Sequence, residues 1–493
     1  MNRWAGRLEL HWGWLRDWFF IVVSLWILGG RIAGWVEWGF LWDWPAEVVF
    51  LGLALYSRWW RWHALAVLQE FARLNPRVHP SEFFEHLHGR LGFLPHRVPA
   101  KAARLVDPDR LDFRTGKKPG QSLWLLLRGV YDTFLFATLA YKAFRWKGAK
   151  YIGAIGSGLS MVWAARVAQL ARMKVSVERT PSLEEAKQAK IIYVLNHTSF
   201  FDFCLAPLAY RRENKDGSAK SFTPSIMVAK DHFKDNFFLY RVIGLGRMLE
   251  AWGMIFVDRK SKEKGTAERA VRLTVKKLLA SSIPFAVYPQ GTRARGQRDR
   301  YGRRWDAGYF CVGKRDRLNK EEGHFKKGAA YVAVELAAGL VKHRLGGKVF
   351  VVPVAMAGPG TACPKGSWKV QTETEVLIKM GEPMPVDSQM KAPDLAQAMD
   401  TALQNLLEVR TRLERRFFTD LRELLEPQAL EEVSVAFKEW RGRGNLLYAV
   451  IDCLYALPKR RWRPLLLELS HALRQENSKE ELTKLKEKVA NYF

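Results

Sequence analysis

Between residues 176 and 386, short apolar runs alternate with longer segments in which apolar residues recur every three or four positions. The short runs are rich in β-branched residues and predict strands, whereas the longer segments predict amphipathic helices. This alternation is typical of an α/β domain in which helices flank a largely parallel sheet. The predicted strands are 191–195, 226–229, 254–257, 284–288, 349–355 and 376–380, and the predicted helices are 236–252, 266–280 and 326–342.

Residues 387–493 show the helical pattern alone. Proline lacks a backbone N–H and interrupts helices, so Pro427, Pro458 and Pro464 predict three breaks in this region. We therefore expect a helical C-terminal extension after the α/β domain.

The first 62 residues differ in composition from the rest of the chain. They hold twelve of the 20 tryptophans, and their six Lys or Arg are nearly balanced by five Asp or Glu. Tryptophan is favoured at the membrane–water boundary, so we expect membrane-embedded or interfacial helices here. The longest apolar run, 18–30, has thirteen residues, and a spanning helix needs about 20. One or two spans, a signal peptide and a Trp-rich docking face on the protein's own core remain open.

Two further stretches connect this region to the α/β domain. Residues 63–120 contain six prolines and predict a connection with short helices. Residues 142–174 carry seven Lys or Arg and no Asp or Glu, and they predict an amphipathic helix on an anionic bilayer or on its own domain. The predicted organisation is a membrane-associated region at 1–120, the α/β domain at 121–386 with its motifs in 176–386, and the helical region at 387–493.

Composition narrows the classes of function. The 493 residues include 79 Lys or Arg and 50 Asp or Glu, and the net charge of +29 favours an anionic partner. The four cysteines form no CxxC pair, which disfavours a cysteine-based zinc site and a disulfide framework and favours a reducing compartment. The chain has no zinc-finger spacing, no GxxxxGK motif and no GxSxG. We therefore expect neither nucleic-acid binding nor hydrolysis by a serine nucleophile.

The candidate chemistry begins directly after the first predicted strand. His197 leaves the strand end and Asp202 follows five residues later, with Ser199 between them as a candidate helix cap. A carboxylate in this position can fix the tautomer of the imidazole, which then takes a proton from a hydroxyl as a general base. A His-x4-Asp pair alone is weak evidence, because many loops contain one by chance.

Three further blocks follow in order: GMIFVDR ending at Arg259, YPQGTR ending at Arg293, and FKKGA containing Lys327. The carboxyl ends of parallel strands gather at one edge of a sheet, so we expect these three cations to converge near His197. Cationic side chains there suit a phosphate dianion. Each cation taken singly is explained equally well as a surface charge, whereas the ordered blocks together favour a site.

With the later VPV block at 352–354, these blocks resemble the four motifs of the PlsC-type glycerolipid acyltransferases, which include 1-acylglycerol-3-phosphate acyltransferase. The family's HxxxxD block is similar to 197–202, its GxIFVDR block to 253–259 and its EGTR block to 290–293. The resemblance covers about 176–386. It implies acyl transfer from acyl-CoA or an acyl-acyl carrier protein to a glycerolipid hydroxyl at the membrane surface, and we expect the acceptor to be lysophosphatidate, which gives phosphatidate.

The candidate site combines three groups of residues. The catalytic pair is His197 and Asp202; the phosphate ligands are Arg293, Arg259 and Lys327; and the supporting residues are Asn196, Gln290, Gly291, Thr292 and Pro353. We expect no metal ion and no resident cofactor.

The chain departs from the family pattern in two places. Gln290 stands where the family usually has glutamate, which puts in doubt any role that needs a negative charge there. The segment 294–324 is longer than the family pattern, and its part from 295 to 320 holds nine Lys or Arg and three Asp or Glu. This insert is either a binding surface for lipid headgroups or an acidic carrier protein, or a solvated loop.

The resemblance leaves the acceptor open. Glycerol-3-phosphate and another lysolipid, such as a lyso-ornithine lipid, are alternatives to lysophosphatidate. A non-catalytic basic protein that binds membranes or lipid is the alternative of another class. We expect anionic membrane lipids, a lysophospholipid substrate and an acyl carrier protein as candidate partners, at the cytoplasmic face of a membrane such as the bacterial inner membrane.

Overall fold

The computed structural model of the chain describes a central and C-terminal portion of the sequence. The described residues are 171–178, 189–213, 219–221, 225–229, 254–257, 265–280, 284–298, 308–311, 325–365, 370–441 and 443–492, together with single residues and two-residue pieces between 164 and 305. The predicted membrane region at 1–62, the connection at 63–120, most of the basic stretch at 142–174 and most of the predicted helix at 236–252 lie outside them. None of the helices in the described ranges combines the length and apolar character that a bilayer crossing requires.

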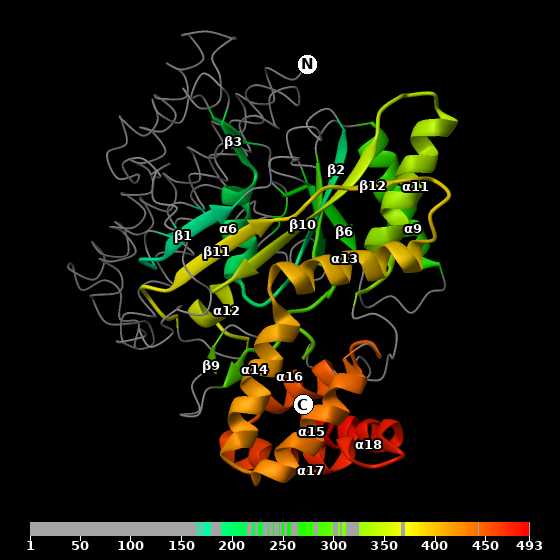
Figure 1. Cartoon of the computed structure of the whole chain (residues 1–493). Helices are drawn as coiled ribbons and strands as arrows, with labels where there is room; N and C mark the ends of the chain where they lie inside the picture. The colour runs from blue at the N-terminus through cyan, green and yellow to red at the C-terminus, as the bar shows by residue number, and fades with distance from the viewer. Residues whose placement is uncertain are drawn as a thin grey trace, which may run out of the picture.

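An eight-stranded sheet forms the centre of the α/β domain (Figure 1). Its order is β1-β11-β10-β2-β7-β5-β6, and β12 also pairs with β10. The strands are β1 Lys174–Glu178, β2 Lys190–Leu195, β5 Ser225–Ala229, β6 Ile255–Val257, β7 Phe285–Val287, β10 Val349–Ala357, β11 Glu375–Met380 and β12 Met384–Val386. Two small hairpins join β3 Arg211–Glu213 to β4 Ala219–Ser221 and β8 Gln297–Arg298 to β9 Arg304–Trp305.

The six predicted strands are all present, but the sheet is mixed. Strands β10, β2, β7, β5 and β6 are parallel to one another, as predicted. Strands β11 and β12 pair with β10 in the antiparallel sense, and β1 runs parallel to β11. The prediction of a largely parallel sheet therefore holds for the half that carries β2 and β7 and is wrong for the other edge.

Pro353 lies where the partner of β10 changes along one side of that strand. β10 pairs with β12 up to Val351 and with β11 from Val354 onward. The carbonyl of Pro353 accepts a hydrogen bond of 2.8 Å from the N–H of Gly381, in the link between β11 and β12. A proline is tolerated here because the strand ladder is already interrupted on the side that its missing N–H would face.

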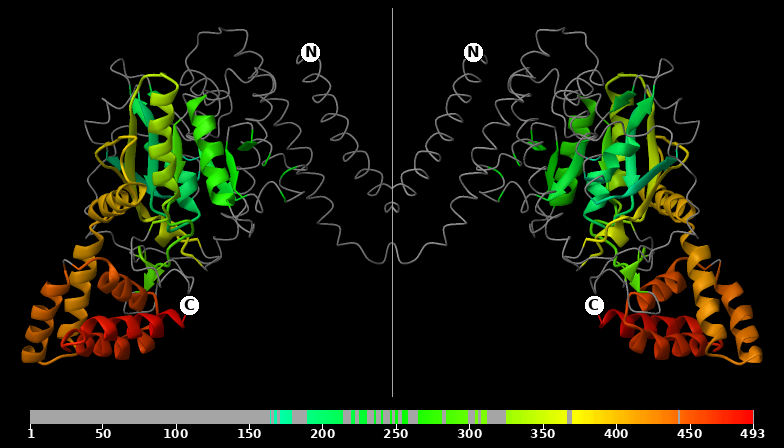
Figure 2. Two further views of the ribbon diagram at one scale, coloured as in Figure 1. Left: turned by 90° about the vertical axis from the view of Figure 1, so that its right-hand side faces the viewer. Right: turned by 90° about the vertical axis from the view of Figure 1, so that its left-hand side faces the viewer.

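Helices cover the sheet and close its core. They are α6 Phe201–Ala209, α9 Thr266–Leu279, α11 Gly328–Lys342 and α12 Pro359–Ala362. Helices α9 and α11 pack side by side, and α11 contacts β10 (Figures 1 and 2). A Cβ added at Gly339 would lie 3.0 Å from a methyl of Leu279, so the glycine lets α11 approach the end of α9 closely.

The C-terminal region is entirely helical where it is described, as predicted. Helix α13 contacts α11 and β10, and α14–α18 pack together at one end of the molecule (Figures 1 and 2). Buried apolar side chains of this region form one continuous cluster with those of the sheet. The helices are α13 Ala392–Leu406, α14 Val409–Arg422, α15 Pro427–Trp440, α16 Leu446–Tyr455, α17 Lys459–Leu473 and α18 Ser478–Ala490.

The three prolines of this region behave differently. Pro427 is the first residue of α15 and Pro458 caps α17, so both mark helix starts as predicted. Pro464 lies inside α17, and the break predicted there is wrong. Both Pro464 and Arg460, whose carbonyl loses its helical partner, are exposed, so water can satisfy that carbonyl.

Candidate active site

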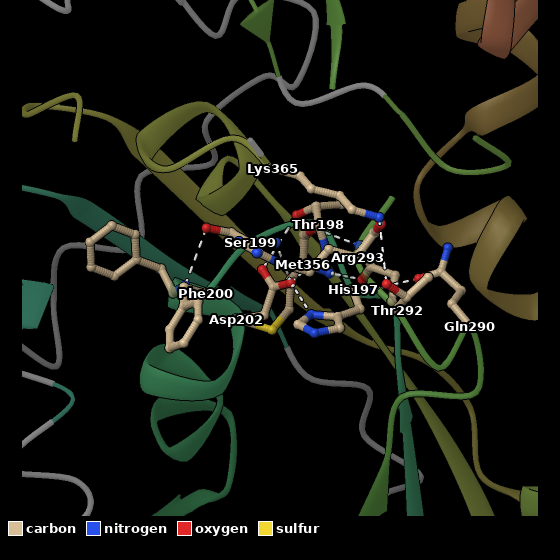
Figure 3. Close-up of polar contacts among 12 residues, drawn as sticks. His197, Thr198, Ser199, Phe200, Asp202, Gln290, Thr292, Arg293, Met356 and Lys365 are labelled. Carbon is tan, nitrogen blue, oxygen red and sulfur yellow. Dashed lines mark hydrogen bonds and ion pairs between the residues drawn. The ribbon is translucent and has the colours of Figure 1, made fainter. Parts of the chain in front are cut away.

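The imidazole of His197 lies just beyond the carboxyl end of β2, in the turn that leads into α6 (Figure 3). β2 is buried along almost its whole length, between β10 and β7. This central strand therefore delivers His197 to the edge of the sheet where ligand sites of parallel α/β domains occur.

Asp202 lies in the first turn of α6, and its side chain is fully buried. Its Oδ2 accepts hydrogen bonds from His197 Nδ1 at 2.9 Å, from Thr198 N at 2.5 Å and from Ser199 N at 2.7 Å. A buried carboxylate needs such donors, because burial otherwise penalises its charge. The predicted pairing of His197 with Asp202 is thus present, and two backbone N–H groups hold the carboxylate in place.

This contact determines the tautomer of the imidazole. The carboxylate accepts, so the neutral ring carries its proton on Nδ1 and keeps a lone pair on Nε2. The His197 side chain is 23% exposed, and the ring of Tyr288 lies 4.6 Å from it between centroids. Burial, with added repulsion from Tyr210 and Asp202, raises the pKa of Tyr288 well above its usual value. The imidazole of His197 therefore lies beside an aromatic ring that stays uncharged.

Ser199 was expected to cap the helix that follows. Helix α6 begins at Phe201 with Phe200 as its N-cap residue. The hydroxyl of Ser199 nevertheless accepts a hydrogen bond of 3.2 Å from the N–H of Phe201 and donates one of 2.9 Å to the carbonyl of Cys363. Ser199 thus satisfies one free N–H of the helix and ties the turn to the segment after β10.

The backbone of His197 is held from both sides by the loop after β7. Its N–H donates to Oε1 of Gln290 at 2.6 Å, and its carbonyl accepts from the N–H of Ala294 at 2.6 Å. Gln290 is only 2% exposed, and its Nε2 donates to the carbonyl of Tyr309 at 2.8 Å. Both halves of the amide are therefore used, one as acceptor and one as donor.

Asn196 fixes the end of β2 against β10. Its buried side chain donates from Nδ2 to the carbonyl of Met356 at 2.9 Å and accepts from the N–H of Met356 at 2.7 Å (Figure 3). An amide can form such a two-point contact with a strand backbone because it carries one donor side and one acceptor side. Asn196 therefore fixes the end of β2 that leads to His197, and its supporting role in the site stays a prediction.

Gly291 occupies a left-handed conformation, with φ of +67°, at the end of a turn closed by its N–H and the carbonyl of Tyr288. A Cβ at this position would lie 2.9 Å from the Cε of Lys326. Glycine is needed here for its backbone angle and for the lysine packed over it. The lysine that packs over this glycine is Lys326, whereas the predicted Lys327 is the N-cap residue of α11; both lysines are exposed.

Arg293 and Lys365 bring two cations to the rim of the site. The guanidinium of Arg293 lies 5.4 Å from the centre of the exposed Phe200 ring. Lys365 Nζ donates to the carbonyl of Arg293 at 2.6 Å and to Thr292 Oγ1 at 3.5 Å (Figure 3). Arg293 also acts electrostatically on Cys363, whose pKa is raised by burial and lowered in part by this guanidinium. The geometry provides positive charge close to the turn that holds His197.

The structure brings together most of the predicted site residues, but it does not describe all of them. His197, Asp202, Asn196, Gln290, Gly291, Thr292 and Arg293 gather at the ends of β2 and β7, and Pro353 lies within β10 beside β2. Arg259 lies outside the described residues. In the described part of the chain, no group of three or more His, Cys, Asp or Glu side chains is arranged to hold a metal ion.

Lys365, Tyr309 and two aspartates of the C-terminal helices also contact this region but were missed from the sequence. Lys365 follows Cys363 and Pro364 in a segment without a motif, so its neighbours in the sequence gave no signal. Asp452 and Asp400 lie in helices where an isolated acidic residue is ordinary. Their contacts with Tyr309 and its neighbours connect residues at least 91 positions apart, and no local pattern reports such a contact.

Residues 172–357 match a protein family described as acyltransferase. The crystal structure of the 1-acyl-sn-glycerophosphate acyltransferase PlsC from Thermotoga maritima is similar at 19% sequence identity, covering 58% of this chain and 96% of that one, with a TM-score of 0.36. None of the curated proteins matches the chain.

Proposed function

We propose that this chain, an acyltransferase by its domain at 172–357, transfers a fatty acyl group from an acyl thioester to the hydroxyl of 1-acylglycerol-3-phosphate. The product is phosphatidate, and the donor is acyl-CoA or an acyl-acyl carrier protein. The family match supports acyl transfer in general. The glycerolipid acceptor is proposed from the motif resemblance and from the cations beside His197.

The contact between His197 and Asp202 carries the proposal. Asp202 binds Nδ1 at 2.9 Å, and the partly exposed ring offers Nε2 as the basic atom. A hydroxyl is a weak nucleophile until a base removes its proton, and an imidazole with one free lone pair is suited to that step. Pairing with Asp202 also stabilises the imidazolium that forms.

The proposed step forms an ester bond and breaks a thioester bond. His197 Nε2 takes the proton of the acceptor hydroxyl while that oxygen attacks the thioester carbonyl. The tetrahedral intermediate collapses, the thiolate leaves, and the imidazolium returns the proton to the sulfur. A thiolate leaves readily, so no covalent acyl-enzyme is required. General-base assistance of this kind typically accelerates a reaction by about 10²–10⁴-fold.

The acceptor phosphate is assigned to the cationic rim. Arg293 and Lys365 are connected through the Arg293 carbonyl and lie beside the turn of His197. A guanidinium can grip phosphate at two points and orient the acceptor hydroxyl towards the base. Arg259 and Lys327 are further candidates on the motif resemblance. The cations of the insert at 294–324, apart from its buried residues 309–311, and the Trp-rich region at 1–62 are proposed to face an anionic membrane, at the cytoplasmic side.

The decisive experiment compares His197→Ala with the full chain in a detergent-solubilised acyl-transfer assay. We expect kcat to fall about 10²–10⁴-fold while the melting temperature is retained. His343→Ala is the matched control, because His343 is exposed at the end of α11. Near-normal turnover by His197→Ala would refute the general-base assignment.

The same assay, run with several acceptors and both donor types, identifies the substrates. We expect lysophosphatidate to be acylated faster than glycerol-3-phosphate or a lyso-ornithine lipid. A preference for either of the other two would keep the acyltransferase but change its acceptor. No transfer to any acceptor by the unaltered protein would favour the non-catalytic alternative.

A further inference from the structure

A buried segment of three residues, Tyr309, Phe310 and Cys311, joins the active-site loop to the C-terminal helices. Their exposed fractions are 1%, 2% and 0%. The three successive backbone N–H groups all donate to Oδ2 of Asp452 in α16, at 2.8, 2.6 and 3.0 Å. Asp452 is itself fully buried.

This arrangement is an anion site that the chain fills with its own carboxylate. Successive N–H groups that point to one side form a concave site for a negative charge. A buried carboxylate in turn requires several donors to offset its desolvation. The 309–311 segment and Asp452 therefore satisfy each other, across 141–143 residues of sequence.

The side chain of Tyr309 makes a second contact with the C-terminal region. Its hydroxyl donates to Oδ1 of Asp400 in α13 at 2.6 Å. Burial and the neighbouring Asp400 carboxylate raise the pKa of Tyr309 well above its usual value, so the phenol stays protonated and remains a donor. Two helices thus fix both the backbone and the side chain of Tyr309.

The same segment reaches His197 through Gln290. The carbonyl of Tyr309 accepts from Gln290 Nε2 at 2.8 Å, and Gln290 Oε1 accepts from the backbone N–H of His197 at 2.6 Å. A second link ties the active-site loop to the segment, because the N–H of Arg295 donates to the carbonyl of Cys311 at 2.7 Å. The polar contacts run without a gap from α16 to the backbone of His197.

We propose that Asp452 and Gln290 are positioning residues of the active site, through which the C-terminal helical region holds the backbone of His197. The inference rests on the proposed role of His197 as the base. It assigns the C-terminal region a supporting role in catalysis. It also explains why this chain has glutamine at position 290.

The reason is a matter of donors and acceptors. His197 N–H can only donate to position 290, and the carbonyl of Tyr309 can only accept from it. Glutamine makes both hydrogen bonds at once. An ionised glutamate can accept the bond from His197 only, and its negative charge would repel the carbonyl oxygen of Tyr309. A protonated glutamate could again donate one bond and accept the other, so Gln290→Glu should regain activity as the pH falls.

The test measures kcat and KM of the full chain carrying Asp452→Asn or Gln290→Glu. Small displacements of a catalytic group lower turnover steeply, so we expect kcat to fall about tenfold in each variant with KM for the acyl thioester unchanged. For Gln290→Glu we also expect the pH optimum of kcat to move to a lower pH than that of the unaltered enzyme. Val433→Ala, in the buried core of α15, is the control for simple destabilisation of the C-terminal helices.

The double variant sharpens the test. Residues that act through one chain of contacts have non-additive effects, so Asp452→Asn combined with Gln290→Glu should lose little more kcat than the worse single variant. Fully multiplicative losses, or an equal fall of kcat in Val433→Ala at matched melting temperature, would overturn the positioning role. An unchanged pH optimum in Gln290→Glu would also contradict it.

His197→Ala separates the two proposals. If that variant is inactive while Asp452→Asn and Gln290→Glu keep normal kcat, the positioning role alone is wrong. If His197→Ala keeps normal turnover, the proposed function is wrong whatever the other variants show.

Discussion

Two buried aspartates, one at each end of this network, are both stabilised by hydrogen-bond donors, but the donors differ. Asp202 in α6 and Asp452 in α16 are both fully buried, and each gathers three hydrogen bonds on a single oxygen. Asp202 binds two backbone N–H groups and the imidazole of His197. Asp452 binds three backbone N–H groups.

The difference lies in what the third donor can do. The imidazole bound to Asp202 is 23% exposed and can gain a proton on its other nitrogen. The three described donors to Oδ2 of Asp452 are buried backbone amides, which do not titrate. The first arrangement is therefore suited to proton transfer, whereas the second can only hold a segment of chain in place.

A buried carboxylate with three donors is thus not by itself evidence of catalysis. Its role depends on whether one of the donors is a titratable side chain that reaches a surface. By this criterion Asp202 is placed to act on the proposed reaction through His197, whereas Asp452 holds the conformation of 309–311. The following predictions are ordered by the size of the effect that each expects.

Asp202→Asn should produce the largest loss. The amide can keep its oxygen toward the three donors that share Oδ2, but it lacks the negative charge that stabilises the imidazolium. We expect kcat to fall about 10²–10⁴-fold, with the circular dichroism spectrum unchanged. The double variant Asp202→Asn with His197→Ala should have a kcat no lower than that of His197→Ala alone, because the two residues act as a unit. A multiplicative loss in the double variant would separate them.

Asp452→Ala should act mainly on stability. It leaves three buried N–H groups without their acceptor, and we expect the free energy of unfolding to fall by about 3–5 kcal/mol. Thermal and urea denaturation of the full chain measure this effect. Asp387→Ala is the control, because Asp387 is exposed. A melting temperature no lower than that of the control would show that the 309–311 segment does not depend on Asp452.

Arg293→Ala should have the smallest effect, and on binding rather than on turnover. An interaction made equally in the ground state and the transition state raises KM when it is lost and leaves kcat nearly unchanged. We expect KM for lysophosphatidate to rise about tenfold, which corresponds to about 1.4 kcal/mol. Arg272→Ala, on the exposed face of α9, is the matched control. An unchanged KM would place the phosphate away from Arg293.

The parts of the fold that follow from local pattern were predictable. Buried apolar runs located β2, β7 and β10, and the spacing of His197 and Asp202 located the turn between β2 and α6. The motif order predicted an acyltransferase domain, and residues 172–357 match a family described as acyltransferase. These features depend on neighbours within a few residues, where sequence pattern is informative.

The parts that depend on distant partners were not predictable. The antiparallel edge arises because β11 returns beside β10 after α12, and an apolar run carries no sign of its direction. The amide of Asn196 meets Met356 at a separation of 160 residues, and Lys365 meets Arg293 at 72. A lysine at the surface and a lysine that packs on the site look alike in sequence, because their contacts are made by residues far away in the chain.

The link between Tyr309 and Asp452 has a consequence for the newly made protein. Tyr309 leaves the ribosome 143 residues ahead of its acceptor, an interval of about 7 to 30 seconds at common rates of synthesis. Throughout that interval the nascent catalytic half carries an unfilled anion site. The anion site is therefore filled only after α16 has been synthesised, and a chain that terminates before Asp452 lacks this contact.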